Sequence, residues 1–178
     1  MARLSVRLYG DPILRTVAEP VMAVTPEIKT IIADMTETMW HQVGVGLAAP
    51  QVGISLRILV MDDGKRGARA LLNPSITDRR GSVVEEEGCL SIPGVFGDVE
   101  RSQWISVSAL DENGAPISFE AQGLQAKVVQ HEIDHLDGVL FIDRLSAIRR
   151  KLLEPKLARM QGGESERSAP DASASPSF

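Results

Sequence analysis

Apolar residues recur at helical spacing in two segments of the chain. In the first, residues 26 to about 42, one stripe would face a core: Ile28, Ile31, Ile32, Met35 and Met39. Thr25 and Pro26 suit the N-cap and the first helical position, and Gly44 with Gly46 ends the periodicity. We therefore expect a helix here that serves as scaffold.

The second segment with helical spacing is residues 124–136. Its apolar positions recur with a period near 3.6: Leu124, Val128, Val129, Ile133 and Leu136. Gly138 follows at a place where helices commonly end. A second helix is therefore expected over this segment.

Other segments have the patterns of strands. The apolar run at residues 56–61 predicts a buried strand, and a second short strand is expected around residues 70–73. Residues 103–110 mostly alternate apolar with polar side chains, and Asn113-Gly114 before residues 116–119 predicts a hairpin turn. The sequence lacks both internal repeats and the regular alternation of a doubly wound sheet. We therefore expect an α+β fold with mostly antiparallel sheets, packed around the second helix.

Length and composition indicate one folded domain followed by a tail. The chain has 178 residues, of which 43% are hydrophobic, enough for one sizeable core. Residues 161–178 are rich in Gly, Ser, Ala and charged residues and poor in large apolar ones. Because such a segment buries too little apolar surface to offset its chain entropy, we expect a domain over residues 1–160 and a disordered tail over residues 161–178.

Charge and hydropathy argue against two classes of partner. The 19 basic and 24 acidic residues give a formal net charge of -5, without the basic excess that is typical of sequence-specific nucleic-acid binding. The sequence has no apolar run of roughly 18 residues that could span a membrane, and its first residues lack the apolar core of a signal peptide. We expect a cytoplasmic protein.

Candidate chemistry lies on the second predicted helix, in His131-Glu132-Ile133-Asp134-His135. Two histidines four residues apart lie on one face of a helix and can bind one metal ion. Glu132 would lie beside that face, where it can reach a water molecule on the metal without being a ligand. This is the position of a general base, although the motif also occurs in helices without a metal.

A third ligand is needed to complete such a site. In the thermolysin type it is a downstream glutamate, and in the metzincin type a histidine would stand at position 141, which here is Phe141. His41 closes the first helix and is interpreted as an ordinary helix-end histidine. Cys89, the only cysteine, is the better candidate because a thiolate binds Fe(II) or Zn(II) well.

Three blocks of the sequence resemble the motifs of the peptide deformylases, in the order and at the separations typical of that family. They are Gly-Val-Gly-Leu-Ala-Ala-Pro-Gln at 44–51, Glu-Gly-Cys-Leu-Ser at 87–91 and Gln-His-Glu-Ile-Asp-His-Leu at 130–136. The resemblance extends from Gly10-Asp11-Pro12 to about residue 160. It implies a hydrolase that removes the formyl group from the N-terminal methionine of newly made polypeptides.

The resemblance also implies a set of site residues. Cys89, His131 and His135 would hold the metal, with water in the fourth position, and Glu132 would act as base and then as acid. The side-chain amide of Gln51 and the backbone N–H of Leu90 would stabilise the oxyanion. The family implies Fe(2+), for which Zn(2+), Ni(2+) or Co(2+) can substitute.

The substrate would be bound through its backbone and its methionine side chain. The resemblance implies that the formyl-methionyl backbone lies as an added strand beside Val45 and Gly46. Val45, Leu124 and Val128 would line the methionine pocket, although each could equally be plain core. Glu85, Lys127 and Phe96 are departures from side chains that are common in the family near this cleft.

Two further predictions concern charged residues. Glu87 and Arg101 match a buried pair that braces the cysteine loop in the family, with an ordinary solvated ion pair as the alternative. Residues 144–159 contain six basic side chains and one acid, Glu154, which predicts a basic helical segment. It could contact ribosomal RNA transiently, or it could be a solvated helix face.

Three other functions fit these residues less well. A non-catalytic metal-binding or peptide-binding homologue would have no need of Glu132, Gln51 and all three ligands together. A zinc endopeptidase would lack the Glu-Gly-Cys-Leu-Ser block. The glycines at 44 and 46 could suggest a dinucleotide site, but that motif requires a preceding strand and a following helix, and here a helix precedes and a strand follows.

Overall fold

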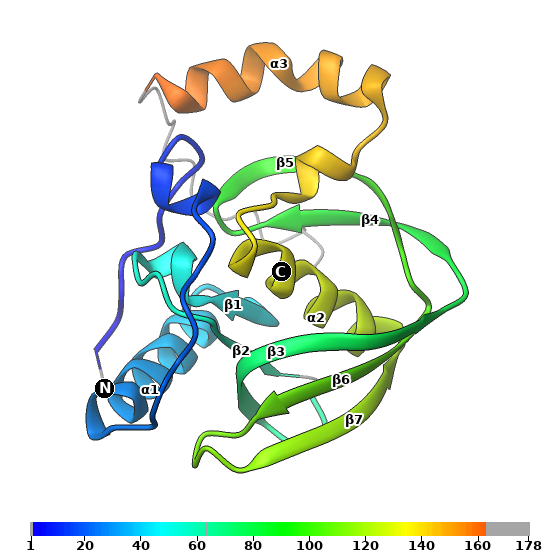
Figure 1. The fold of residues 1–178 in the computed structure, drawn as a ribbon. Coiled ribbons are helices and arrows are strands. Elements are labelled where there is room, and N and C mark those ends of the chain that lie inside the picture. Colours follow the sequence, from blue (N-terminus) through cyan, green and yellow to red (C-terminus); the bar gives the residue numbers. More distant parts are fainter. Residues whose placement is uncertain (1, 63, 163–178) are drawn as a thin grey trace.

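Two antiparallel sheets lie on opposite sides of the helix α2 (Gly123–Leu136) in the computed structural model, which describes residues 2–62 and 64–162 (Figure 1). The larger sheet has the strand order β1-β2-β3-β6-β7, formed by β1 (Gly46–Ala48), β2 (Ile58–Asp62), β3 (Ala68–Arg80), β6 (Trp104–Leu110) and β7 (Pro116–Gln122). The smaller sheet pairs β4 (Val83–Cys89) with β5 (Ile92–Arg101). The remaining elements are α1 (Pro26–His41), α3 (Ala147–Gln161) and the short 3-10 helices η1 (Pro12–Arg15), η2 (Ala49–Val52) and η3 (Phe141–Arg144). The predicted α+β class is confirmed.

Both helices predicted from apolar spacing are present. Helix α1 begins after Thr25, whose side chain accepts a hydrogen bond from the backbone N–H of Ile28, and it ends one residue before the predicted boundary. Helix α2 matches the predicted 124–136 apart from its first residue. Gly138 follows α2 with a φ of 72°, and a Cβ there would lie 2.7 Å from the carbonyl oxygen of Arg15. Only glycine fits this turn.

The patterns of the strands follow from how many faces of the large sheet are covered. In β2, Ile58 and Val60 pack on the side of α1, and the intervening Leu59 and Met61 pack on the side of α2. A strand buried on both faces consists of a nearly continuous run of apolar side chains, which explains the apolar run at residues 56–61. In β6 every second residue is buried and faces α2, namely Ile105, Val107 and Ala109. The residues between them are only partly buried.

The strand expected at residues 70–73 is much longer in the structure. β3 continues to Arg80, because shifts in its register against β6 absorb the interruption at Asn73-Pro74. Asn73 has a φ of 49°, which is unusual outside glycine. Its side-chain amide donates to the carbonyl oxygen of Val21 and its side-chain oxygen accepts from the backbone N–H of Val21. The predicted end at Asn73 was therefore wrong.

The hairpin of β4 and β5 was not predicted. Glu85, Glu86 and Glu87 are consecutive in β4, and β5 contains Gly94 and Gly97, so neither strand has a clear apolar alternation. The hairpin nevertheless carries Cys89 at the end of β4. It therefore supplies one of the candidate ligands.

Helix α3 covers the side of the hairpin that faces away from α2 (Figure 1). Leu153 and Leu157 pack in one cluster with Val95, Val99 and Phe141. This confirms a helix in the predicted basic segment, with Gln161 still helical. Residues 163–178 of the predicted tail lie outside the described residues. None of the helices in the described part of the chain is long and apolar enough to span a membrane.

Candidate metal centre

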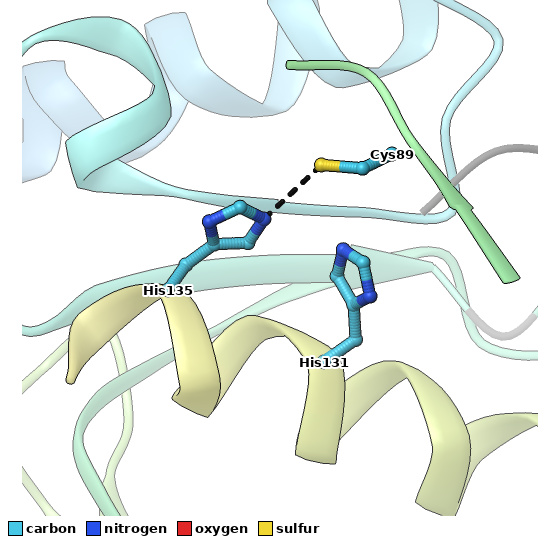
Figure 2. A group of neighbouring side chains, drawn as sticks. All are labelled: Cys89, His131 and His135. Carbon is cyan, nitrogen blue, oxygen red and sulfur yellow. Dashed lines mark hydrogen bonds between the residues drawn. The ribbon is translucent and has the colours of Figure 1, made fainter. Parts of the chain in front are cut away.

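The three candidate ligands come together between α2 and the end of β4. His131 and His135 project from one face of α2 toward Cys89, as Figure 2 shows. The Cys89 sulfur lies 3.2 Å from Nε2 of His135, and the two imidazole ring centres are 5.0 Å apart. One ligand atom from each of the three residues lies within 4.8 Å of the others, and all three residues are buried. The third candidate ligand beside the two histidines is thus Cys89, whereas His41 lies at the exposed end of α1.

The chemistry of these donors fits a divalent metal ion. Burial raises the pKa of the Cys89 thiol far above its ordinary value, and a hydrogen bond from the backbone of Ser91 offsets this only in part. A buried thiolate therefore needs positive charge beside it, which a divalent cation supplies. Burial lowers the pKa of His135 well below its ordinary value, so the imidazole is neutral, the form that binds a metal. Three protein ligands leave a coordination position open, as in catalytic sites.

Glu132 is a buried carboxyl group beside this centre. Its side chain has no exposed surface, and among the described residues neither carboxyl oxygen has a hydrogen-bond partner. Burial raises the pKa of Glu132 well above its ordinary value, and the charge of Glu87 raises it further. A carboxyl group with a raised pKa is suited to accept and return a proton near neutral pH.

Gly46 allows β1 to approach Glu132. A Cβ at position 46 would lie 2.6 Å from Oε1 of Glu132 and 2.8 Å from Cγ1 of Val128, closer than real Cβ atoms come. Any larger residue would displace β1 or these side chains. The strand and the carboxyl group are therefore in direct contact because residue 46 is glycine.

Gln51 lies in η2 with its side-chain amide fixed at both ends. Its Oε1 accepts from the backbone N–H of Ala48 at 2.8 Å, which directs Nε2 toward Cys89 and Ser91. Nε2 is 3.6 Å from the Cys89 sulfur and 3.3 Å from the Ser91 hydroxyl. Leu90 follows Cys89 in the turn between β4 and β5. Both predicted oxyanion donors thus adjoin the cysteine, and the hydroxyl of Ser91 is a contact that sequence analysis missed.

Glu87 and Arg101 form a buried ion pair, so the alternative of a solvated pair is wrong. Arg101 donates from Nε and Nη2 to the two carboxylate oxygens at 2.8 and 3.0 Å. Oε2 of Glu87 is also 3.0 Å from Nδ1 of His131. Burial raises the pKa of Glu87, but the hydrogen bonds from Arg101 and His131 outweigh it and lower the pKa to about 2. An ionised Glu87 therefore fixes the orientation of a candidate ligand ring.

Sequence analysis missed two members of this network, Asp134 and Arg144. Arg101 and Arg144 both donate to the Asp134 carboxylate. The available signal was an ionisable residue inside a helix predicted to be core. Arg144 had been interpreted only as part of the basic segment, although its guanidinium is paired with Asp134.

The predicted substrate contacts are partly brought together. Val45 is partly buried against the core cluster that contains Val128, and Gly46 contacts Val128 directly. Val128 is 1% exposed, so its side chain belongs to the core as well as to the face beneath Gly46. Leu124 lies one helical turn away and is 47% exposed. The structure therefore places Val45, Gly46 and Val128 together and Leu124 at an exposed rim.

The departures from the family pattern make contacts of their own. Nζ of Lys127 donates to the backbone carbonyl of Glu86 at 2.8 Å and lies 3.5 Å from a carboxylate oxygen of Glu85. Lys127 and Glu85 thus link α2 to β4. Phe96 covers Gly88, where a Cβ would lie 2.6 Å from its ring. Lys127 and Glu85 thus connect the two elements that carry the candidate ligands, and Phe96 packs within the hairpin.

Comparisons with known proteins identify relatives of this chain. The family model described as polypeptide deformylase matches residues 4–151. A peptide deformylase of Alkalilimnicola ehrlichii is 51% identical over 90% of this chain and 92% of its own length. The crystal structure of a Legionella pneumophila peptide deformylase superposes with a TM-score of 0.86 at 39% identity, covering 94% of this chain and all of that one. A Synechococcus elongatus peptide deformylase, solved in complex with actinonin, gives 0.83 at 41% identity over 89% of this chain and 87% of that one.

Proposed function

This chain belongs to the polypeptide deformylase family, and from that premise we propose that it is a metal-dependent hydrolase that removes the formyl group from the N-terminal methionine of newly made polypeptides. The observation that carries the proposal is the buried group of Cys89, His131 and His135 with Glu132 beside it. A thiolate and two imidazoles would hold the metal, and a carboxyl group of raised pKa would move the proton.

We assign the proton transfers to Glu132. A divalent cation held by Cys89, His131 and His135 would supply Lewis acidity, which makes water more acidic and polarises a carbonyl group. Glu132 would take a proton from the water that attacks the formyl carbon. The same carboxyl group would return a proton to the leaving α-amino group. The absence of other hydrogen-bond partners for Glu132 within the described residues supports this role.

Gln51 and Leu90 are the proposed donors to the oxyanion that forms when water adds to the formyl carbon. The hydrogen bond from Ala48 to Oε1 holds the Gln51 amide with its N–H groups toward Cys89. Such a prearranged donor needs no reorganisation during the reaction. The loss of one donor of this kind typically costs about 3–4 kcal/mol of barrier.

The formyl-methionyl backbone would bind beside β1. Within the described residues this strand pairs only with β2, so its other edge could take an added peptide strand. Contact between Gly46 and Glu132 would bring the backbone of the substrate near the base. Val45 and Val128, with Leu124 at the rim, would accept the methionine side chain.

We propose Fe(2+) as the native metal, with Zn(2+), Ni(2+) or Co(2+) as substitutes. A thiolate with two imidazoles accepts each of these ions, and availability decides among them. An iron-loaded sample should lose activity in air, because both Fe(II) and the Cys89 thiolate can be oxidised. Activity of the iron form that is unchanged by air would oppose this choice.

We also propose a transient ribosome contact through residues 144–159 and a cytoplasmic location. The surface for this contact is smaller than the number of basic residues implies. Arg144 and Arg150 pair with acidic side chains, and Arg149 and Lys156 donate to backbone carbonyls of β5. Lys151 and Arg159 are exposed and would carry the attraction to phosphate. Ribosome pelleting that is unchanged by charge reversal at these two positions would refute the contact.

The decisive experiment measures release of a free amine from a formyl-Met tripeptide by protein loaded with Fe(II) or Ni(II) without oxygen. Glu132→Gln should lower the rate by about 10²- to 10⁴-fold while metal content stays the same, since general acid–base catalysis contributes that much. An internal peptide bond serves as the comparison substrate. Its cleavage would indicate an endopeptidase, and an absence of turnover with metal fully bound would indicate a binding protein.

A further inference from the structure

The polar network behind His131 continues beyond Arg101. Two nitrogens of the Arg101 guanidinium bind Glu87, and the third, Nη1, donates to Oδ2 of Asp134 at 2.6 Å. Asp134 stands on α2 between the two histidines, but its carboxylate joins the Glu87–Arg101 pair. The same helix therefore presents two ligands and the anion that holds Arg101.

Arg144 closes this network from the solvent side. It is the last residue of η3, in the connection from α2 to α3 (Figure 1). Its Nε donates to Oδ2 of Asp134 at 2.6 Å and its Nη2 donates to Oδ1 at 2.7 Å, a two-pronged arrangement that fixes both groups. The Arg144 side chain is 43% exposed, whereas those of Asp134 and Arg101 are 11% and 5% exposed. Contacts thus lead from solvent through Arg144, Asp134, Arg101 and Glu87 to His131.

The charges of this network balance only when Arg144 is present. Two carboxylates, Glu87 and Asp134, share two guanidiniums, Arg101 and Arg144. Without Arg144, Asp134 would keep one cationic partner and would compete with Glu87 for the Arg101 guanidinium. Because Arg101 holds both oxygens of Glu87, a shift of Arg101 loosens the carboxylate that orients the His131 ring.

We propose that Arg144, acting through Asp134 and Arg101, is a positioning residue for the metal centre. It fixes the Glu87 carboxylate and with it the direction in which the His131 imidazole presents Nε2. The inference rests on the proposed function only in taking Cys89, His131 and His135 as metal ligands. Arg144 itself contacts neither the three candidate ligands nor the peptide strand proposed beside β1. Its effect would therefore reach the metal only through Asp134, Arg101 and Glu87.

The η3 turn has other anchors, so Arg144 is not needed to hold it in place. Phe141 and Ile142 are buried in the core. Asp143 binds Arg15 and Arg150 and accepts a hydrogen bond from the backbone N–H of Leu140. Loss of Arg144 should therefore leave the turn and α3 folded.

Arg150 offers a matched control for Arg144. It lies in the same segment, its side chain is 38% exposed, and its Nη1 donates to Oδ1 of Asp143 at 2.9 Å. Arg150→Met removes an exposed ion pair of similar exposure that has no link to Asp134. Arg150→Met therefore measures what the loss of an exposed ion pair in this segment does by itself.

The experiment measures Co(II) binding to the full chain by competition with a chelator, together with the absorption spectrum of the Co(II) form. Arg144→Met should weaken Co(II) binding about tenfold, the lower end of what outer contacts to a ligand contribute, and should shift the Co(II) absorption bands. Arg144→Lys keeps the charge but not the bidentate contact with Asp134, so its Co(II) affinity should fall between those of the native protein and Arg144→Met. Arg150→Met should match the native protein within twofold.

Equal Co(II) affinity and equal spectra for Arg144→Met and Arg150→Met would overturn the proposal. Circular dichroism and the thermal unfolding of each metal-free variant establish that the measured protein is folded. If Arg144→Met does not fold, Arg144→Lys alone decides, because the proposal requires it to bind Co(II) more weakly than the native protein. Failure of the deformylase proposal would appear separately, as absence of formyl hydrolysis by the native protein with metal bound.

Discussion

The two sides of α2 are stabilised by different interactions. On the side of the large sheet, Val129, Ile133 and Leu136 pack into a cluster of apolar side chains from β2, β3 and β6. On the side of the hairpin, the same helix presents His131 and Asp134 to a network of buried charges. Apolar burial stabilises the first side, whereas on the second side each buried charge needs a partner, because an unpaired buried charge is costly. The candidate metal centre lies on this second side.

The largest expected effect on stability lies on the sheet side. Leu71 of β3 is fully buried in the cluster beneath α2. Leu71→Ala should lower the free energy of unfolding by about 2–5 kcal/mol, through lost apolar burial and the cavity that remains. Chemical unfolding of the metal-free protein measures this change. The rate of deformylation per folded molecule should stay native, and a matching loss of rate would show that the two sides are not separable.

On the hairpin side, the expected effect depends on pH. The pKa of Glu87 is lowered from 4.5 to about 2 in the folded protein, so its contribution is present above pH 4.5 and is lost as the pH falls toward 2. This lowering of the Glu87 pKa corresponds to at most about 3 kcal/mol of unfolding free energy. Unfolding of the metal-free protein at a series of pH values should show this loss, and Glu87→Gln should flatten it. An unchanged pH dependence in the variant would assign the loss to other carboxylates.

The smallest effect is expected for an exposed ion pair, which tests whether burial makes the hairpin side distinctive. Arg3 and Glu37 approach within 3.6 Å, with side-chain exposures of 60% and 29%. Arg3→Ala should change the free energy of unfolding by less than about 1 kcal/mol, because water already screens the pair. A loss as large as that for Leu71→Ala would mean that the pairing of charges, and not their burial, determines how much such a pair stabilises the protein.

The same comparison separates what could be predicted from the sequence from what could not. Apolar spacing located α1, α2 and the ribbon of β6 and β7, because in each of them apolar side chains recur with the period of the element. The hairpin of β4 and β5 was not predicted. Its residue Glu87 is buried in a pair with Arg101 of the next strand, and such a pair leaves no apolar pattern in the sequence. β3 was cut short at Asn73, whose left-handed conformation depends on hydrogen bonds to Val21, far away in the sequence.

The candidate site divides in a similar way. Cys89, His131, His135 and Glu132 could be proposed from residue type, spacing and family resemblance, and the structure brings them together. Asp134 and Arg144 could not, because their importance lies in a chain of contacts that starts at Arg101. Pairing between charges distant in sequence leaves no local pattern, so only a three-dimensional structure reveals it.

The path of the chain between β3 and β6 has a consequence for folding order. These two strands are neighbours in the large sheet, yet β4 and β5 leave the sheet between them and form a separate hairpin. The register of the sheet can therefore form without the hairpin being docked against α2. Cys89 and His131 are separated by about 40 residues, and a metal ion bound by both would offset the entropy of closing that loop. Such an ion would thus favour docking of the hairpin on the rest of the domain.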